Sequence, residues 1–471
     1  MSTVTCLDRL RRTQLASAAG ALFALSAPIA HATTFVTNCN DSGAGSLRAA
    51  VASATEGETV DASALTSASP GCALSRITLS TGEINVTRNA LRVKGPGPAK
   101  MAVTARYDNN AGSTHQYYNR IFNHSGTGTF EIDDLSISNG YLKPASGDAL
   151  GGCIYSKGAI KLIKADVRGC TAKVVSGMVK GGGVYAKTSA YTSLTNFSSN
   201  TALGANGNYS YGGGIFTPGG IIAKYGEFKL NSADVSGALD ARGTLALIHN
   251  VTIADNHANR NGAGLTILNP GASITLINST ISGNTAESLV GGAYLSGNNI
   301  ALYGNTIAYN TAGVRIIFGA GLTVLPAGTN STLRLESNLI ASNSYGASVA
   351  PSDFSIIGSA TATGGNNLVR EPSSGLPPDT IVGKCPLLKP LADNGGPTRT
   401  HSLYGHSPAI DAGNNASNST SDQRGHPPGN GDTVSFTRIS GPPGTTPVTD
   451  IGAFELDQTE EIFAAGFEGC P

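Results

Sequence analysis

An apolar residue followed three positions later by a small or amide residue recurs along the middle of the chain. The pairs are Ile137/Gly140, Val167/Cys170, Phe197/Asn200, Phe228/Asn231, Ile253/Asn256, Ile281/Asn284, Ile307/Asn310 and Ile340/Asn343. Successive pairs are separated by 25 to 33 residues. A repeat of this length predicts a solenoid rather than a globular fold.

Each repeat begins with a glycine-rich run that is followed by apolar and often aromatic residues. These runs cover residues 151–155, 181–185, 212–216, 262–265, 291–294 and 319–322. A second alternating stretch, such as 274–281, follows before the next pair. Two or three short strands per repeat, separated by Gly, Asn and Ser turns, predict an all-β fold, a single-stranded right-handed parallel β-helix.

Stacking of the coils explains the residue types of the repeat. Equivalent residues of neighbouring coils lie ~4.8 Å apart, so they form columns. We expect the apolar position to form an internal spine, and the Asn position to bond amide to amide in the left-handed turn conformation. The glycines permit a positive φ. An all-α solenoid is excluded because residues 130–350 show no sustained 3.6 period, and β-propeller blades are longer.

Residues 1–32 have the features of a signal peptide for export. Arg9, Arg11 and Arg12 precede an apolar stretch at 15–30, and Ala30-His31-Ala32 supplies a cleavage pattern. The stretch is shorter than the ~20 residues that a membrane-spanning helix needs. We therefore expect an exported protein with no transmembrane segment in the mature chain.

The rest of the chain divides into four predicted parts. These are an N-terminal cap with the first coils at 33–98, β-helix repeats at 99–384, a loop-rich C-terminal region at 385–456 and a tail at 457–471. In the first part, Ser46 is expected to cap a short helix that covers the first coil and stops at Gly57. The less regular segment 99–130 is expected to be an inserted loop, which carries Tyr107, His115, Tyr117 and Tyr118.

Six cysteines remain after the predicted cleavage. An even number in an exported chain predicts disulfides, although six cysteines allow 15 pairings. Proximity in the sequence favours Cys39 with Cys72, Cys153 with Cys170, and Cys385 with Cys470. Their spacing does not suit zinc, and we expect no metal and no other cofactor; Ca²⁺ is not indicated.

Composition narrows the choice of partners. The 31 basic and 31 acidic residues cancel, and charged residues make up only 13% of the chain. This balance lacks the basic surface that nucleic acids or anionic membranes require. We expect a monomer whose partner is a polysaccharide or a cell-envelope surface.

An aromatic column is the main candidate for ligand binding. If Ile154, Val184 and Ile215 point inward, alternation places Tyr155, Tyr185 and Phe216 outward, with Tyr294 in the equivalent place two repeats later. Such a column could stack on sugar rings. The alternative, aromatic packing that stabilises the sheet, is the more common role of such a column.

Carboxylates offer a weaker candidate for catalysis. Asp133 and Asp134 are adjacent, so on a strand only one of them could face a groove. A second acidic group gathers in the C-terminal region with basic partners, and it predicts a charge-assisted hydrogen-bond network more readily than a Ca²⁺ or catalytic site. Its members are Asp393, Arg399, His401, Asp411, Asp422, Arg424 and Asp450. No residue is assigned as catalytic.

Two segments and the repeats resemble known bacterial families. The segment 36–51 resembles the N-terminal segment of CSLREA-type surface proteins, with departures at Gly45 and Ala49. The motifs at 386–401, 407–413, 422–425 and 450–455 resemble the choice-of-anchor Q domain. The repeats resemble those of polymorphic outer-membrane proteins and of the pectate-lyase-like β-helix superfamily. The end, 462–471, resembles a short tail of some exported bacterial proteins.

These resemblances imply a secreted or surface-displayed bacterial β-helix protein. We expect non-catalytic adhesion or glycan binding. The alternatives are a polysaccharide lyase or glycoside hydrolase on the same scaffold, and a structural envelope protein.

Overall fold

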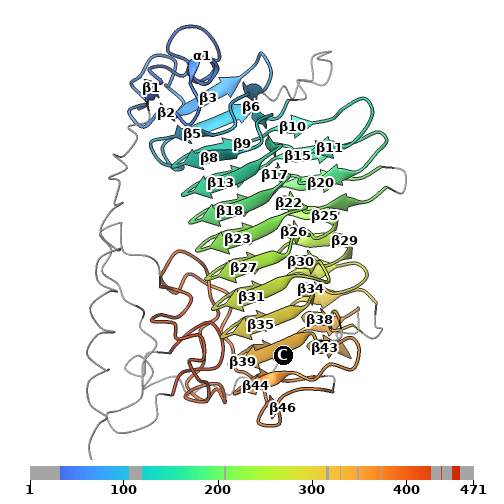
Figure 1. Ribbon diagram of the computed structural model, residues 1–471. Coiled ribbons are helices and arrows are strands. Elements are labelled where there is room, and N and C mark those ends of the chain that lie inside the picture. The colour runs from blue at the N-terminus through green and yellow to red at the C-terminus, as the bar shows by residue number, and fades with distance from the viewer. Residues whose placement is uncertain are drawn as a thin grey trace, which may run out of the picture. The chain divides into compact units, whose positions relative to one another are not determined.

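A computed structural model describes residues 32–105, 119–205, 208–314, 318–328, 330–346, 350–372, 374–425, 436 and 448–456. Within these residues the chain forms a parallel β-solenoid of about 10 turns (Figure 1). In the middle turns the chain passes through four sheets, as β12, β13, β14 and β15 illustrate. The predicted β-solenoid is therefore confirmed.

Sheets A and B carry the longest uninterrupted strand stacks. Sheet A contains β1 (Thr33–Phe35), β2 (Thr59–Asp61), β5 (Leu91–Lys94), β8 (Thr129–Asp133), β13 (Ala159–Ile163), β18 (Ser189–Ser193), β23 (Gly220–Lys224), β27 (Leu245–His249), β31 (Ser273–Ile277), β35 (Asn299–Tyr303), β39 (Thr332–Glu336) and β44 (Thr363–Gly365). Sheet B contains β3 (Arg76–Leu79), β6 (Ala102–Ala105), β9 (Ser136–Ser138), β14 (Asp166–Arg168), β19 (Asn196–Ser198), β24 (Glu227–Lys229), β28 (Thr252–Ala254), β32 (Thr280–Ser282), β36 (Thr306–Ala308), β40 (Leu339–Ala341), β45 (Leu368–Val369) and β46 (Ile381–Val382).

Sheets C and D complete each turn. Sheet C contains β4 (Ile84–Val86), β7 (Phe122–His124), β12 (Ile154–Ser156), β17 (Val184–Ala186), β22 (Ile215–Thr217), β26 (Leu239–Ala241), β30 (Leu265–Leu268), β34 (Ala293–Gly297), β38 (Leu322–Pro326) and β43 (Phe354–Ile356). Sheet D contains β10 (Tyr141–Leu142), β11 (Ala149–Leu150), β15 (Thr171–Lys173), β16 (Val179–Lys180), β20 (Thr201–Leu203), β21 (Ser210–Tyr211), β25 (Ser232–Val235), β29 (His257–Asn261), β33 (Thr285–Ala286), β37 (Thr311–Ala312), β41 (Ser344–Tyr345) and β42 (Ala350–Pro351). Three successive turns contribute two strands each to sheet D, namely β10 and β11, β15 and β16, and β20 and β21, so their connections from sheet D to sheet C are longer.

The apolar spine occupies one register position of sheet B. The side chains of Val103, Ile137, Val167, Phe197, Phe228, Ile253, Ile281, Ile307, Ile340 and Val369 pair in order and are fully buried. The rings of Phe197 and Phe228 stack with their centroids 4.6 Å apart. The predicted inward column is confirmed.

The predicted amide column is a continuous buried ladder. Each Asn side chain donates to Oδ1 of the next member over 2.8 to 2.9 Å; the members are Asn200, Asn231, Asn256, Asn284, Asn310 and Asn343, and Asp353 ends the ladder. The predicted left-handed conformation of the Asn residues is wrong. The residue before each Asn has the positive φ, such as 55° at Ser199 and 58° at Tyr309. That residue makes the turn, which leaves the Asn side chain free to point into the interior.

The structure contains a second amide ladder, which the sequence pattern did not predict. Asn305 donates to Asn338 over 2.9 Å, and Asn338 donates to Asn367 over 3.0 Å. Asn305 and Asn338 stand five positions before Asn310 and Asn343, and that fixed offset is the signal that could have revealed the ladder.

Glycines ahead of sheet C meet two different demands. Gly181 has a φ of +77°, as predicted for the turn. At Gly182 the limit is space, because a Cβ there would lie 2.4 Å from the carbonyl oxygen of Gly213 in the next coil. A side chain at Gly182 would push the coils apart.

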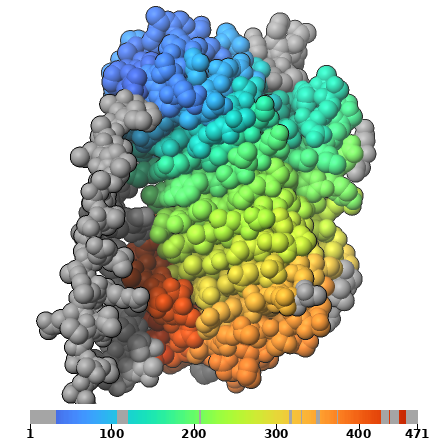
Figure 2. All heavy atoms as spheres, viewed as in Figure 1, coloured from blue at the N-terminus to red at the C-terminus, as the bar shows by residue number. Residues whose placement is uncertain are grey.

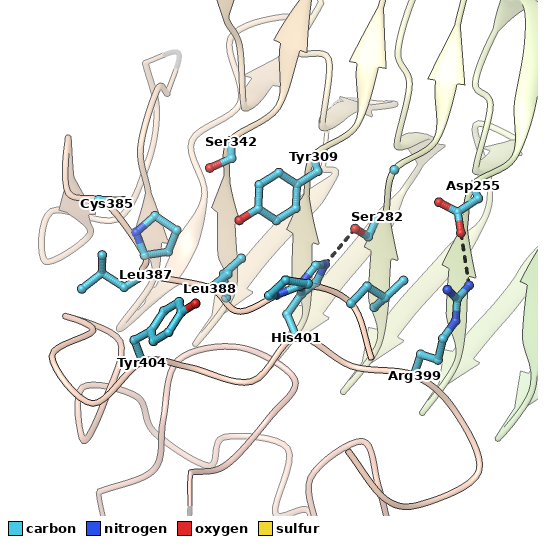
Figure 3. A pocket seen from close by; sticks show the side chains of 14 residues that line it. Asp255, Ser282, Tyr309, Ser342, Cys385, Leu387, Leu388, Arg399, His401 and Tyr404 are labelled. Atoms are coloured by element: carbon cyan, nitrogen blue, oxygen red, sulfur yellow. Dashed lines mark hydrogen bonds and ion pairs between the residues drawn. The ribbon is translucent and has the colours of Figure 1, made fainter. Parts of the chain in front are cut away.

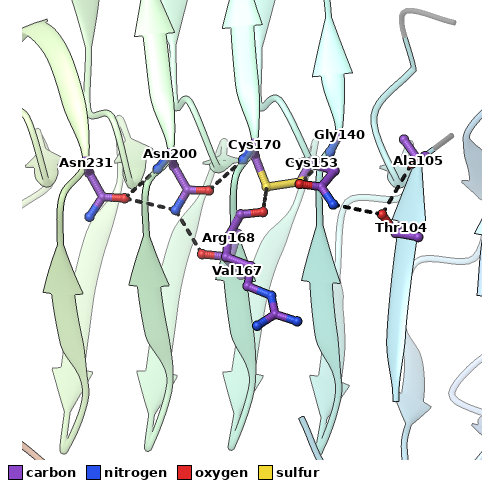
Figure 4. The surroundings of a disulfide bond; sticks show 10 residues. Thr104, Ala105, Gly140, Cys153, Val167, Arg168, Cys170, Asn200 and Asn231 are labelled. Atoms are coloured by element: carbon purple, nitrogen blue, oxygen red, sulfur yellow. Dashed lines mark hydrogen bonds between the residues drawn. A yellow bond between two sulfur atoms is a disulfide. The ribbon is translucent and has the colours of Figure 1, made fainter. Parts of the chain in front are cut away.

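Two of the predicted disulfides are present. Cys39 is bonded to Cys72 and Cys153 to Cys170. Figure 4 shows that the second bridge continues the amide ladder at its N-terminal end, because the backbone N–H of Cys170 donates to Oδ1 of Asn200 over 3.1 Å. Cys385 is disulfide-bonded, and Cys470, its predicted partner, lies outside the described residues.

The predicted N-terminal helix is present. Within the described residues the one helix is α1 (Leu47–Ser53), which buries Leu47, Ala50 and Val51 and contacts β2 and β4. Ser46 accepts a hydrogen bond from the backbone N–H of Ala49. The helix ends at Ala54, before Gly57.

The predicted inserted loop is wrong for part of its length. Residues 102–105, 122–124 and 129–130 belong to β6, β7 and β8, because their alternating side chains continue the buried columns. Tyr107, His115, Tyr117 and Tyr118 lie outside the described residues.

Residues 385–425 and 448–456, here called the C-terminal segment, lie beside the later coils of the solenoid (Figures 1 and 2). Their hydrogen bonds to Thr252, Thr280 and Thr306 place them on the outer face of sheet B. Asn250 donates to the backbone oxygens of Asp422, Gln423 and Gly425 over 2.9 to 3.1 Å. Leu388 and other apolar side chains of the segment form a second buried cluster with sheet B. The segment contains turns and isolated bridges, and no helix or strand, in its described residues. It is loop-rich as predicted.

Candidate functional site

The predicted aromatic column forms on the outer face of sheet C. Tyr155, Tyr185 and Phe216 are aligned by the register of β12, β17 and β22. Their ring centroids are 5.6 and 5.9 Å apart, and their planes differ by less than 10°. Tyr155 and Tyr185 are half-buried, whereas Phe216 is 6% exposed.

Stacking turns the ring faces of the column toward one another. The guanidinium of Arg120 lies 5.3 Å from the centroid of Tyr155, over the ring. A sugar that stacks on an aromatic ring needs an uncovered face, so the middle of this column offers ring edges and hydroxyl groups instead. Burial raises the pKa of Tyr185, which keeps its phenol protonated and able to donate a hydrogen bond.

Tyr294 occupies the same register position but stands apart from the column. Asp240 and Thr266 separate it from Phe216, so it lies three coils later rather than the predicted two. The miscount arose because the coil of β26 begins with Gly237-Ala238 in place of a longer glycine run. Tyr294 packs edge-on against Phe318 at 5.9 Å.

The aromatic column continues sideways into a cleft. Phe216 contacts Tyr211 at 6.2 Å between centroids, and Tyr211 contacts Tyr209 at 6.3 Å. Tyr211 lies on β21, and the cleft runs from there past β25 and β29. This cleft, here called the aromatic cleft, has a volume of about 690 Å³. The residues that line it are Tyr209, Tyr211, Asp234, Val235, Asn259, Arg260, Asn261, Ser288 and Leu289.

Polar groups in the aromatic cleft are held in fixed positions. Asp234 accepts hydrogen bonds from the backbone N–H and hydroxyl of Ser210 and from the amide of Asn259, each over 2.9 Å. Arg260 lies over the ring of Tyr209 at 4.4 Å and donates to its hydroxyl over 3.1 Å. Tyr209 is 40% exposed. The cleft therefore combines an accessible aromatic ring with carboxylate, amide and guanidinium groups.

A buried ion pair supports the inner wall of the cleft. Asp240 is fully buried, and it accepts from Nη2 of Arg242 and from the hydroxyl of Ser236, each over 2.7 Å. The guanidinium of Arg242 lies 5.6 Å from the ring centroid of Tyr211. This pair joins the outer face of sheet C to β21, and so fixes the orientation of Tyr211.

The carboxylates predicted as weak candidates have structural partners. Asp133 faces outward and is bonded by Nε of Arg92 over 2.7 Å, while Asp134 makes a turn with a φ of 51°. Burial raises the pKa of Asp133 despite that bond. Alternation places Glu131, and not Asp134, on the same face as Asp133.

Some of the charged residues predicted in the C-terminal region are hydrogen-bonded to one another, and Asp422 with Arg424 is the ion pair among them. Asp422 accepts from Arg424 and from the backbone N–H of Glu455, and Asp450 accepts from the backbone N–H of Asp411. Asp393 accepts from the N–H of Gly395 in an exposed turn.

Arg399 and His401 contact the solenoid instead. Arg399 pairs with Glu227 and Asp255, and His401 contacts Ser282. In the described part of the chain, no group of three or more His, Cys, Asp or Glu residues has the geometry of a metal site.

The residues of the aromatic cleft were not singled out by the sequence. They come from sheet D and its loops, where the register between β25 and β29 is irregular. The sequence Tyr209-Ser-Tyr211, immediately before the glycines at 212–214, was the available signal.

Two further findings bear on the class of protein. Within the described ranges no helix has the length and apolar character of a membrane span. Comparisons with models of protein families, with curated proteins and with solved structures give no match to this chain. The fold therefore defines the class, a disulfide-containing parallel β-solenoid.

Proposed function

We propose that this protein is an exported glycan-binding protein and that the aromatic cleft is its binding site, which holds a glycan without cleaving it. The observation that carries the proposal is the exposed ring of Tyr209 beside the side chains of Asp234, Asn259 and Arg260 in one cleft. Sugar rings present apolar C–H faces and polar hydroxyl edges. A ring face with planar hydrogen-bonding groups around it matches both surfaces.

The physical setting of Tyr209 favours a preformed site. Arg260 holds the ring from one side, and the bonds to Ser210 and Asn259 hold Asp234. Groups that are already oriented lose less conformational entropy when a ligand binds. Tyr155 and Tyr185 extend this surface along sheet C with their hydroxyl groups.

Two further features support export to a cell surface. The bonds Cys39–Cys72 and Cys153–Cys170 persist in oxidising compartments. The basic and apolar start of the chain and the resemblances to CSLREA-type and choice-of-anchor Q proteins favour a secreted or surface-displayed bacterial protein.

A panel of immobilised polysaccharides tests this proposal: xylan, cellulose, chitin, peptidoglycan and polygalacturonate. We expect retention on at least one polymer, without release of soluble sugar or new ultraviolet absorbance. Arg260→Ala should weaken that retention at least fivefold, because it removes both a polar partner and the support of Tyr209. Release of unsaturated oligosaccharides would establish a lyase instead, and failure to bind any polymer would contradict the proposal.

A further inference from the structure

A second cavity lies between sheet B and the C-terminal segment (Figure 3). Its volume is about 610 Å³. Ser282, Tyr309 and Ser342 line it from the solenoid side, and Leu387, Leu391 and His401 line it from the segment. This cavity is separate from the aromatic cleft, since the two have no lining residue in common.

Ser282 and His401 form a directed hydrogen bond in the wall of this cavity. The hydroxyl oxygen of Ser282 lies 2.8 Å from Nε2 of His401, and Nδ1 of His401 lies 2.7 Å from the carbonyl oxygen of Lys389. A carbonyl oxygen can only accept, so Nδ1 carries the proton in the neutral ring. Nε2 is then an acceptor, and the Ser282 hydroxyl donates to it. This is the arrangement of a nucleophile, a base and a group that orients the base.

Ser282 lines the cavity and has small neighbours on sheet B. The residues at the same register position on the neighbouring strands are Ala254 and Ala308, whose side chains are single methyl groups. On the segment side, prolines and leucines form an apolar wall; they are Pro386, Leu387, Leu388, Pro390 and Leu391. The cavity therefore pairs a hydroxyl and an imidazole with a surface for a small apolar group.

A buried hydroxyl without a partner also lines this cavity. The Oγ atom of Ser342 is buried and makes no hydrogen bond. Leaving such a group unsatisfied destabilises the protein, and a hydrogen bond from the hydroxyl to a ligand oxygen would recover that loss. Ser342 and Ser282 stand on the same side of the cavity, with Tyr309 between them (Figure 3).

We propose that Ser282 and His401 are the nucleophile and general base of an esterase site, which takes esters of small apolar carboxylic acids. Ser282 Oγ bonds to the ester carbonyl carbon while Nε2 of His401 takes the hydroxyl proton. The carbon–oxygen bond to the alcohol then breaks, and the alcohol leaves with that proton. Water adds to the acyl-serine by the same route, which releases the acid and restores Ser282.

The charge state of His401 suits this role. Burial lowers the pKa of His401 to about 4, so the ring is neutral at neutral pH and its Nε2 lone pair is available. The ring of Tyr309 lies 5.3 Å from that of His401 and helps to shield it from water. The alternative is a structural role, in which the Ser282–His401 hydrogen bond only attaches the C-terminal segment to sheet B. A pair with that role would not react with electrophiles.

Covalent labelling of the folded, full-length protein decides between these two roles. The probe is a fluorophosphonate, and the modified residue is located by mass spectrometry. We expect an adduct on Ser282 that is absent from Ser282→Ala and forms at least 100-fold more slowly in His401→Gln. Hydrolysis of p-nitrophenyl butyrate should fall in parallel.

Thr280→Val is the matched control, because Thr280 lies on the same strand and face and donates to Gln423 of the segment over 2.6 Å. It loses a contact with the segment but should be labelled at the wild-type rate. Should His401→Gln fail to fold, the wild-type rate must still fall as the pH falls through about 4. No adduct on Ser282 of the folded wild-type protein, or equal labelling of His401→Gln, would overturn the esterase site.

Discussion

Asn343 donates its side-chain amide to Oδ1 of Asp353 over 2.9 Å, so a carboxyl group ends a ladder that is otherwise built of amides. The backbone N–H of Asn343 donates to the same oxygen, and that of Glu371 donates to Oδ2. Burial nevertheless raises the pKa of Asp353 to about 6. The end of the ladder is therefore sensitive to pH, whereas its interior is not.

Asp353→Asn should change how stability depends on pH. Between its ordinary pKa of 3.8 and about 6, Asp353 is protonated in the folded protein and ionised in the unfolded chain, so its contribution is full below pH 3.8 and is lost as pH rises through about 6. We expect the free energy of unfolding of the variant, relative to that of wild type, to be about 2 to 3 kcal/mol higher at pH 7.5 than at pH 3.5. Denaturant unfolding at the two pH values measures this difference. An identical difference at both pH values would contradict this account.

Asn256→Ala tests the interior of the ladder. Asn256 accepts from the amide and the backbone N–H of Asn231 and donates to Asn284, all inside the solenoid. Its removal leaves buried donors and an acceptor without partners, so we expect a loss of about 3 to 5 kcal/mol in the free energy of unfolding. The control, Asn330→Ala at an exposed turn, should change it by less than ~0.5 kcal/mol.

The Cys153–Cys170 bridge should be partly replaceable by an amide. The double variant Cys153→Ala/Cys170→Ala opens a bridge between residues 17 apart and should lose about 3 kcal/mol. Cys153→Ala/Cys170→Asn should recover about 1 to 2 kcal/mol of this, because an amide at 170 can donate to Oδ1 of Asn200. Equal thermal unfolding of the two double variants would show that position 170 does not belong to the ladder.

His401 should make the C-terminal segment sensitive to acid. Its pKa is about 4 in the folded protein and 6.5 in the unfolded chain, so the unfolded chain binds more protons between these values. The contribution of His401 to the free energy of unfolding is therefore full above pH 6.5. It falls by about 3 kcal/mol as the pH falls through about 4. His401→Gln should remove this part of the acid sensitivity in unfolding curves.

Burial also lowers the pKa of His249 to about 4, with the same sign. His249→Gln should therefore remove the contribution of His249 to the loss of stability in acid, which is separate from that of His401. Full retention of the acid sensitivity in both single variants would contradict these assignments.

The columns of the solenoid could be predicted from the sequence because equivalent residues recur in it once per coil. The Ile281 and Asn284 positions need only the count of residues per coil. The conformation of the turn was misassigned because the pattern does not show whether the Asn or the residue before it reverses the chain.

The two cavities depend on contacts that no local pattern records. Tyr209 and Arg260 are 51 residues apart and meet only after the coils are stacked through an irregular register. Ser282 and His401 are 119 residues apart and meet because polar and apolar groups of sheet B bind the C-terminal segment. The sequence showed the charged residues of that segment but not the surface on which they lie.

The central claim, glycan binding through the aromatic cleft, is tested most directly by calorimetric titration of Tyr209→Ala with the polysaccharide that the wild-type protein retains. Loss of the exposed ring should weaken binding at least tenfold, since stacking on this ring supplies the apolar part of the contact. Tyr191→Ala, on the outer face of sheet A, is the control and should bind as wild type does. Equal affinities for Tyr209→Ala and the wild-type protein would contradict the claim.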